Sequence, residues 1–361
     1  MMKLFKYRPL SEFLFKELFY QELYFASYKE LNDPLDLSAR IEFTAEKEDQ
    51  IEYLIWVLFK TNLTISETNI SDFDKDNNNN KLISFYKNHT VINAFKRSIY
   101  DKLVMFKAKE NLIWLDNIET ILVDTSKELN LDFRLNFTDF KNELQRLTQK
   151  FLENSYTTCF SATNNDFLMW SHYASKHSGI CLEFSIEHSG LFPYVKKGHR
   201  KADQDNYLQR ISKWEVNEAI YWDRIREVSY QDEQPFINFF DFSPVFDNEL
   251  DCDLIGLSKG WTHGFAHELE MVFSTKTKPW KYENEWRAIE INFGEPKHPE
   301  ERIRHYPIEV LSSIYFGIRT PEDVKKRIHD IFKQHRKAII LYDCKPTNGR
   351  ELNFEIWENY D

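Results

Sequence analysis

Two glutamates stand out for their chemistry, and both lie in one aromatic segment, residues 278–287. Glu283 and Glu285 are two positions apart before an apolar run, so on a strand their side chains would share a face. The tryptophans and tyrosines around them would partly desolvate the carboxyl groups, which raises a carboxyl pKa or positions a base. We therefore predict acid–base chemistry here. The alternative is an exposed carboxylate pair matched by Lys281 and Arg287.

A second group of candidates follows a predicted strand at residues 156–160. Ser161 lies just past that strand, where its hydroxyl could be presented to a ligand. Trp170, His172 and Tyr173 cluster on a short helical segment and could stack on a planar ring and hydrogen-bond to it. The alternative places Trp170 and Tyr173 in the core, with His172 as a bridging histidine.

Polar residues near the N-terminus form a third group. Tyr7 and Arg8 end the first predicted strand, and the sequence Asn32-Asp33-Pro34 signals a turn after the second. Arg8 and Asn32 are candidate ligand contacts. The alternative is that Arg8 pairs with a surface acid and that Asn32 only shapes the turn.

One further pattern bears on metals. His263 and His267, followed by Glu268 and Glu270, have the i, i+4 spacing that places two imidazoles on one helical face. Gly264 weakens that helix and no third ligand stands at a fixed spacing, so we expect no metal. The sequence also lacks the GxxxxGK[ST], GxGxxG, GxSxG and HExxH patterns of several common enzyme classes.

The order of the predicted strands and helices that must position these residues indicates an α+β fold with a central mixed or antiparallel sheet. We place the core domain at residues 1–45 and 155–361, and a large helical insertion at 46–154. Spacing and capping signals predict strands at 4–7, 23–26, 156–160, 180–184, 271–275, 286–292, 314–316 and 338–342, with helices at 12–19 (capped by Ser11), 167–175 and after Thr320.

The net charge, the length of the apolar stretches and the spacing of the cysteines argue against some classes of function for this chain. The 361-residue chain carries a formal net charge of −11, which disfavours free nucleic acid as its sole partner. No apolar stretch is long enough to span a bilayer and no signal peptide is evident, so we expect no membrane partner and a cytoplasmic location. The four cysteines lie far apart, as expected for reduced thiols.

Several of these segments together resemble a bacterial family known as domain of unknown function 2971. The resemblance extends from residue 3 to about residue 318, apart from the helical insertion, and implies no activity. The segments that carry it are Lys6-Tyr7-Arg8, Leu31 to Asp36, Cys159-Phe160-Ser161, Met169 to Ala174, His177 to Phe184, and Trp280 to Arg287.

A fainter resemblance is to ADP-ribosyltransferases of the Arg-Ser-Glu type, which carry an Arg, a Ser and a Glu at three strand edges in that order. It implies that Arg8 binds the pyrophosphate of NAD and that Ser161 orients the nicotinamide ribose. Glu285 would hold the ribose 2′-hydroxyl and stabilise an oxocarbenium ion. Asn32 resembles the Asn of relatives that modify DNA or a base.

We therefore expect an NAD-consuming enzyme, a transferase or a glycohydrolase, acting as a bacterial toxin or phage-defence effector. The alternatives are a non-catalytic sensor that binds a nucleotide or a protein, and a metal-dependent hydrolase or nuclease. Expected partners are a nucleotide-type small molecule and a protein or nucleic-acid acceptor, with a homo-oligomer left open. The predicted catalytic residues are Glu285, Arg8 and Ser161, and the predicted substrate-binding residues are Tyr7, Asn32, Trp170, His172, Tyr173, Glu283 and Arg287.

Overall fold

A computed structural model describes most of the chain and divides it into two compact units. The described residues are 2–46, 51, 54–55, 57–58, 90–107, 113–129, 138–144, 146, 154–186, 225–242, 269–291, 296–333, 338–345, 347 and 352–358. The first unit comprises Met1–Leu37, Glu153–Gln234 and Phe273–Asp361, and the second comprises Ser38–Leu152 and Pro235–Val272. The segment 235–272 of the second unit falls within the core domain that is predicted from the sequence.

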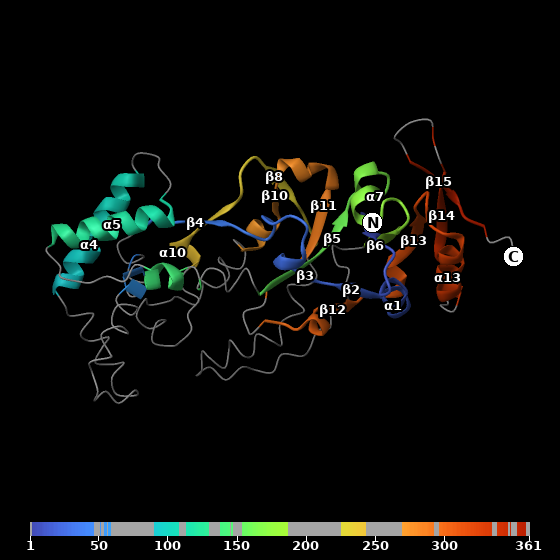
Figure 1. Ribbon diagram of the computed structural model, residues 1–361, viewed down its shortest axis with the longest axis horizontal. Helices are drawn as coiled ribbons and strands as arrows, with labels where there is room; N and C mark the ends of the chain where they lie inside the picture. The colour runs from blue at the N-terminus through green and yellow to red at the C-terminus, as the bar shows by residue number, and fades with distance from the viewer. Residues whose placement is uncertain are drawn as a thin grey trace, which may run out of the picture. The chain divides into compact units, whose positions relative to one another are not determined.

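A nine-stranded mixed sheet forms the first unit, which is therefore α+β as predicted (Figure 1). The strand order is β15-β14-β13-β6-β1-β5-β11-β7, and β3 pairs with β5 beside this path. Among the described strands of this sheet, only β13 and β14 run parallel, because the helix α13 carries the chain between them. The strands are β1 (Met2–Arg8), β3 (Ala26–Ser27), β5 (Ser155–Ser161), β6 (Ile180–Ile186), β7 (Ile225–Glu227), β11 (Glu285–Ile291), β13 (Leu311–Phe316), β14 (Ile340–Lys345) and β15 (Asn353–Ile356).

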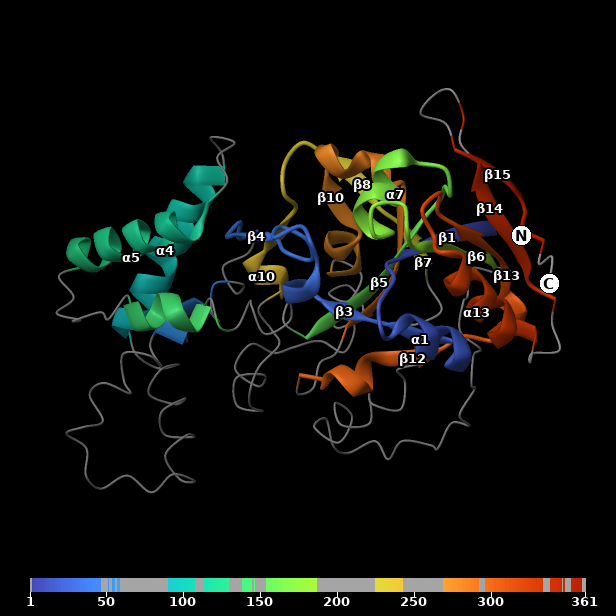
Figure 2. The ribbon, with the colours of Figure 1, turned by 45° about the vertical axis from the view of Figure 1, so that its right-hand side comes forward.

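Helices cover both faces of this sheet. On one face, α1 (Leu14–Tyr20) and α13 (Glu322–Lys333) pack together, and Leu14 and Ile328 join Leu4 and Phe184 of the sheet in an apolar core (Figure 2). On the other face, α7 (Phe167–Tyr173) contributes its fully buried Trp170 to a second apolar cluster. Alternation along β1 produces this division, because successive side chains of a strand point to opposite faces.

The sheet is split between β1 and β5, and this split positions the candidate site. The two strands pair at a single position, Phe5 with Ser161, whereas β1 pairs with β6 over its whole length. Beyond that position β5 pairs instead with β3, through Ala26 and Thr157. The ends of β1 and β5 therefore leave an opening lined by their own side chains.

Short elements line the approach to this opening and complete the first unit. The two-stranded pairs β2 (Glu22–Tyr24) with β12 (Ile303–His305), and β8 (Ser229–Gln231) with β10 (Thr275–Thr277), lie beside the main sheet, with the 3-10 helices η1 (Tyr28–Glu30), η5 (Lys278–Glu283), η6 (Pro299–Arg302) and η7 (Ile308–Val310).

The second unit has a hydrophobic core of its own, built mainly from helices. It contains α4 (Thr90–Lys107), α5 (Leu115–Glu128), α10 (Phe239–Phe242) and the parallel pair β4 (Arg40–Glu42) with β9 (Phe236–Asn238). Ile99, Ile118 and Leu122 are fully buried among its apolar side chains. Phe140 and Leu144, four residues apart in a helical segment, are both buried there.

Two local predictions are wrong in detail. Met271 and the two residues after it are helical rather than extended, and the strand begins at Thr275. The helix α1 begins at Leu14 without a side-chain cap, so Ser11 does not cap it with its hydroxyl. In both cases tertiary packing outweighs a weak local signal.

Candidate functional site

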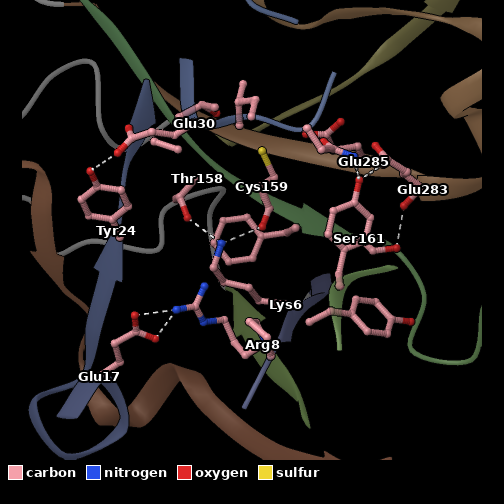
Figure 3. A pocket seen from close by; sticks show the side chains of 18 of the residues that line it. Lys6, Arg8, Glu17, Tyr24, Glu30, Thr158, Cys159, Ser161, Glu283 and Glu285 are labelled. Atoms are coloured by element: carbon pink, nitrogen blue, oxygen red, sulfur yellow. Dashed lines mark hydrogen bonds and ion pairs between the residues drawn. The ribbon is translucent and has the colours of Figure 1, made fainter. Parts of the chain in front are cut away.

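A pocket of about 860 Å³ opens at the split between β1 and β5, a size typical of small-molecule sites (Figure 3). It is lined by side chains from β1, β5, α1, α7, η5 and the start of β11. Of the ten predicted site residues, eight line this pocket: Tyr7, Arg8, Asn32, Ser161, His172, Tyr173, Glu283 and Glu285. Residues from five sequence segments thus meet in one place.

Glu283 and Glu285 do not share a strand face, which corrects the sequence expectation. Glu283 ends the 3-10 helix η5, Asn284 adopts a left-handed conformation at φ 42°, and Glu285 begins β11. The turn brings both carboxylates to one lysine that the sequence analysis did not single out. Lys276 Nζ lies 2.7 Å from Glu283 Oε2 and 3.3 Å from Glu285 Oε2.

These groups belong to a buried ionic cluster of three carboxylates and two cations. Arg287 Nε donates to Glu285 Oε1 at 2.7 Å, and its Nη2 donates to Asp36 Oδ2 at 2.7 Å. Lys276 Nζ also lies 3.3 Å from Asp36 Oδ2. All five side chains are at most 4% exposed. Buried charges require this pairing, because each alone would cost several kcal/mol.

The same cluster separates the pKa values of its two glutamates. Burial works to raise the pKa of Glu285, but the charges of Arg287 and Lys276 outweigh burial and hold that pKa at about 2. For Glu283, burial dominates and raises the pKa above its usual value, although Lys276 opposes it. One carboxylate therefore stays ionised while its neighbour is the better proton acceptor.

Glu283 is also held by a short hydrogen-bond chain. Tyr173 donates its hydroxyl to Glu283 Oε1, and Asn32 Nδ2 donates to Tyr173 Oη at 2.7 Å. Ser161 Oγ donates to the backbone carbonyl of Glu283 at 2.7 Å, which fixes η5 against the end of β5. Asn32, Tyr173 and Ser161 thus position the carboxylate.

Arg8 lies toward the other end of the pocket, where Glu17 of α1 holds it (Figure 3). One terminal nitrogen of Arg8 contacts both carboxylate oxygens of Glu17. On the nearby rim, Tyr24 donates to Glu30 Oε1 at 2.7 Å. The alternative in which Arg8 pairs with an acid is therefore present in the structure, and the acid is Glu17.

Two predicted site residues do not line the pocket. Trp170 is fully buried and packs edge-to-face on Tyr7 at 5.3 Å between ring centroids. Arg287 is also fully buried and reaches the site only through Glu285 and Asp36. His172 does line the pocket, and it is exposed beside Tyr282 at 6.2 Å.

Sequence reasoning missed three side chains that shape the pocket: Lys6, Glu17 and Lys276. Lys6 belongs to the motif Lys6-Tyr7-Arg8, and it interrupts the apolar pattern of its strand. That interruption could have marked Lys6 as a candidate site residue. Nothing in the spacing of Lys276 or Glu17 links them to the site, because their partners are set by the tertiary fold.

The described residues include no group of three His, Cys, Asp or Glu side chains arranged to hold a metal ion. His263, His267 and Glu268 lie outside the described residues, and Glu270 is buried. Within the described part of the chain, no helix is both long and apolar enough to cross a membrane.

Comparison with known proteins supports one of the two resemblances. Residues 169–288 match the model of a family described as Protein of unknown function (DUF2971). The matched region includes α7 from Met169 onward, β6 and the two glutamates, whereas the motifs at Lys6 and Asn32 lie before it. No curated protein and no solved structure matches the chain. The resemblance to ADP-ribosyltransferases therefore rests on the residues alone.

Proposed function

We propose that the chain is an NAD-consuming enzyme, a glycohydrolase or an ADP-ribosyltransferase, with its active site in the pocket at the β1–β5 split. One observation carries the proposal. Two adjacent carboxylates, Glu283 and Glu285, line a pocket of nucleotide size, and their pKa values are shifted in opposite directions. Arg8 and Ser161, the other residues of the predicted triad, line the same pocket.

The proposed reaction breaks the bond between nicotinamide and C1′ of the ribose. The electron pair of that bond leaves with nicotinamide, and C1′ becomes part of an oxocarbenium ion. Glu285, ionised at neutral pH, stabilises this cation electrostatically. Water or an acceptor group then forms a bond to C1′, and its proton passes to Glu283 as general base.

The surrounding residues have supporting roles in this scheme. Tyr173 and Asn32 orient Glu283, and His172, which lines the pocket, offers a ring surface to the substrate. Arg287 and Lys276 keep Glu285 ionised and fix its orientation. In this proposal the protein acts in the bacterial cytoplasm as a toxin or phage-defence effector, because it would consume NAD.

The test measures nicotinamide by chromatography after incubation of the full chain with NAD, first alone and then with cell lysate or nucleic acid. We expect release from the wild type and a loss of 100-fold or more in Glu285→Gln. Glu12→Gln is the matched control, because Glu12 is exposed and outside the pocket, and it should keep full activity. Thermal unfolding checks that both variants fold.

Dependence on lysate would identify a transferase, and release from NAD alone a glycohydrolase. Full activity in folded Glu285→Gln would refute the proposed role of this carboxylate. Nucleotide binding without any release would favour the alternative of a non-catalytic sensor.

A further inference from the structure

Among the residues that the structure describes, Lys6 has no carboxylate partner, unlike the other cations that line the pocket. Among the four lysine and arginine side chains that line it, all of them described, Arg8 contacts Glu17, Lys16 contacts Glu22, and Lys276 contacts three carboxylates. Within the described part of the chain, the ammonium of Lys6 donates to neutral oxygen atoms only. It donates to Thr158 Oγ1 at 2.8 Å and to the carbonyl of Cys159 at 3.0 Å.

The split sheet explains this arrangement. Cys159 pairs with Arg287 of β11 on one side, but on the other side β1 has already diverged from β5. The Lys6 side chain crosses the opening and bonds to a carbonyl near the point where the strands separate (Figure 3). Its ammonium therefore lies over the pocket, next to the ring of Phe160 at 5.2 Å, and the residue is half-buried.

Two hydrogen-bond donors remain available at this point. An ammonium group has three N–H bonds, and Lys6 uses two of them. Thr158 Oγ1 accepts from Lys6, so its own hydroxyl hydrogen is free to donate. Thr158 is buried and lines the pocket beside Lys6.

We infer that Lys6 and Thr158 form an anion-binding subsite that takes a phosphoryl oxygen of the pocket's ligand. A half-buried cation that is paired only with neutral oxygens gains from an anion placed against it. Arg8 is less suited to this task, because Glu17 already occupies its guanidinium. This assignment therefore moves the pyrophosphate of NAD from Arg8, where the family resemblance places it, to Lys6.

The inference depends on the proposed function in one respect: pyrophosphate is chosen as the anion because NAD contains it. We therefore test it without NAD, by calorimetric titration of the full chain with inorganic pyrophosphate and, separately, with inorganic phosphate. Wild type should bind pyrophosphate, and Lys6→Met should weaken binding by at least tenfold. Lys278→Met is the matched control, because Lys278 lies outside the pocket in an exposed ion pair with Asp232, and the affinity of this variant should stay within threefold of wild type.

Thr158→Val provides a second variant of nearly unchanged shape, and we expect a threefold to tenfold loss. It keeps the inference testable where Lys6→Met does not fold. Equal pyrophosphate affinity in wild type and either folded subsite variant would overturn the inference, as would the absence of binding in wild type. Pyrophosphate binding without nicotinamide release would leave the subsite standing and remove the proposed reaction.

The pH dependence gives an independent readout. Burial, together with the charge of Arg8, lowers the pKa of Lys6 to about 8, while Cys159 of β5, Glu17 of α1 and Glu285 of β11 act in the opposite direction. Affinity for pyrophosphate should therefore fall as pH rises through about 8, in wild type and in Lys278→Met alike. Affinity that stays constant or rises from pH 7 to pH 9.5 would contradict the role of the Lys6 ammonium.

Discussion

At the residue scale, the site is defined by how Glu283 and Glu285 share their cations. Glu285 contacts both Lys276 and Arg287, whereas Glu283 contacts Lys276 and the hydroxyl of Tyr173. Each extra cation lowers a carboxyl pKa, so the second partner of Glu285 is what separates the two groups. The chemical difference between the glutamates therefore comes from Arg287, which does not reach the pocket itself.

This difference predicts the pH dependence of nicotinamide release. As a general base, Glu283 must be ionised, and its pKa is raised above the ordinary glutamate value, chiefly by burial. Activity should fall as the pH decreases through that raised pKa, so the acid limb should lie above the range of an ordinary glutamate. In Glu283→Gln, the acid limb should disappear and the rate should fall by about 100-fold to 10,000-fold. The measurement is kcat/KM as a function of pH.

Tyr173→Phe serves as the comparison for this profile. The hydroxyl of Tyr173 stabilises the ionised form of Glu283, so its removal should move the acid limb to higher pH. An unchanged limb in Tyr173→Phe, or a limb that persists in Glu283→Gln, would assign the titration to another group.

At the element scale, the end of β1 depends on the loop 175–179 that precedes β6. Ser175, Lys176 and His177 all have positive φ angles, and Gly179 lies against the end of β1. A Cβ atom at Gly179 would come within 2.3 Å of the carbonyl oxygen of Arg8. The loop therefore fixes the strand that carries Lys6 and Arg8, and it requires glycine at this contact.

We predict that Gly179→Ala lowers the free energy of unfolding by about 2–3 kcal/mol, because the clash is with backbone that cannot move alone. The affinity for pyrophosphate should fall as well, since the end of β1 must shift. Chemical denaturation and calorimetry check both effects. Ser178→Ala, which removes one hydrogen bond to Ser175, is the neighbouring control and should cost about 1 kcal/mol or less. Equal free energies of unfolding in Gly179→Ala and Ser178→Ala would show that the loop accommodates the added methyl group and that the contact does not require glycine.

At the scale of the whole molecule, the chain divides into two units with separate apolar cores. Every pocket-lining residue belongs to the first unit. The core of the second unit includes Leu122, which is fully buried. The candidate chemistry and the helical core of the second unit are therefore assigned to different parts of the chain.

Leu122→Ala tests this division. The cavity that it leaves should lower the stability of the second unit by about 2–5 kcal/mol. Nicotinamide release and pyrophosphate affinity should stay within twofold of wild type at a temperature where the variant is folded. A large loss of either at that temperature would mean that the site depends on the second unit.

The sequence by itself determined the α+β class, most strands of the sheet, and the identity of eight side chains in the pocket. Those inferences depend on local properties: alternation along strands, spacing along helices, and the chemistry of aromatic and acidic residues. The tertiary structure alone decided which charges meet. Lys276, Asp36 and Glu17 reach the site from separate segments, and Lys6 lacks a carboxylate partner because β1 diverges from β5 at Phe5. Ion pairs and pKa shifts depend on distances through space, and no spacing along the chain encodes them.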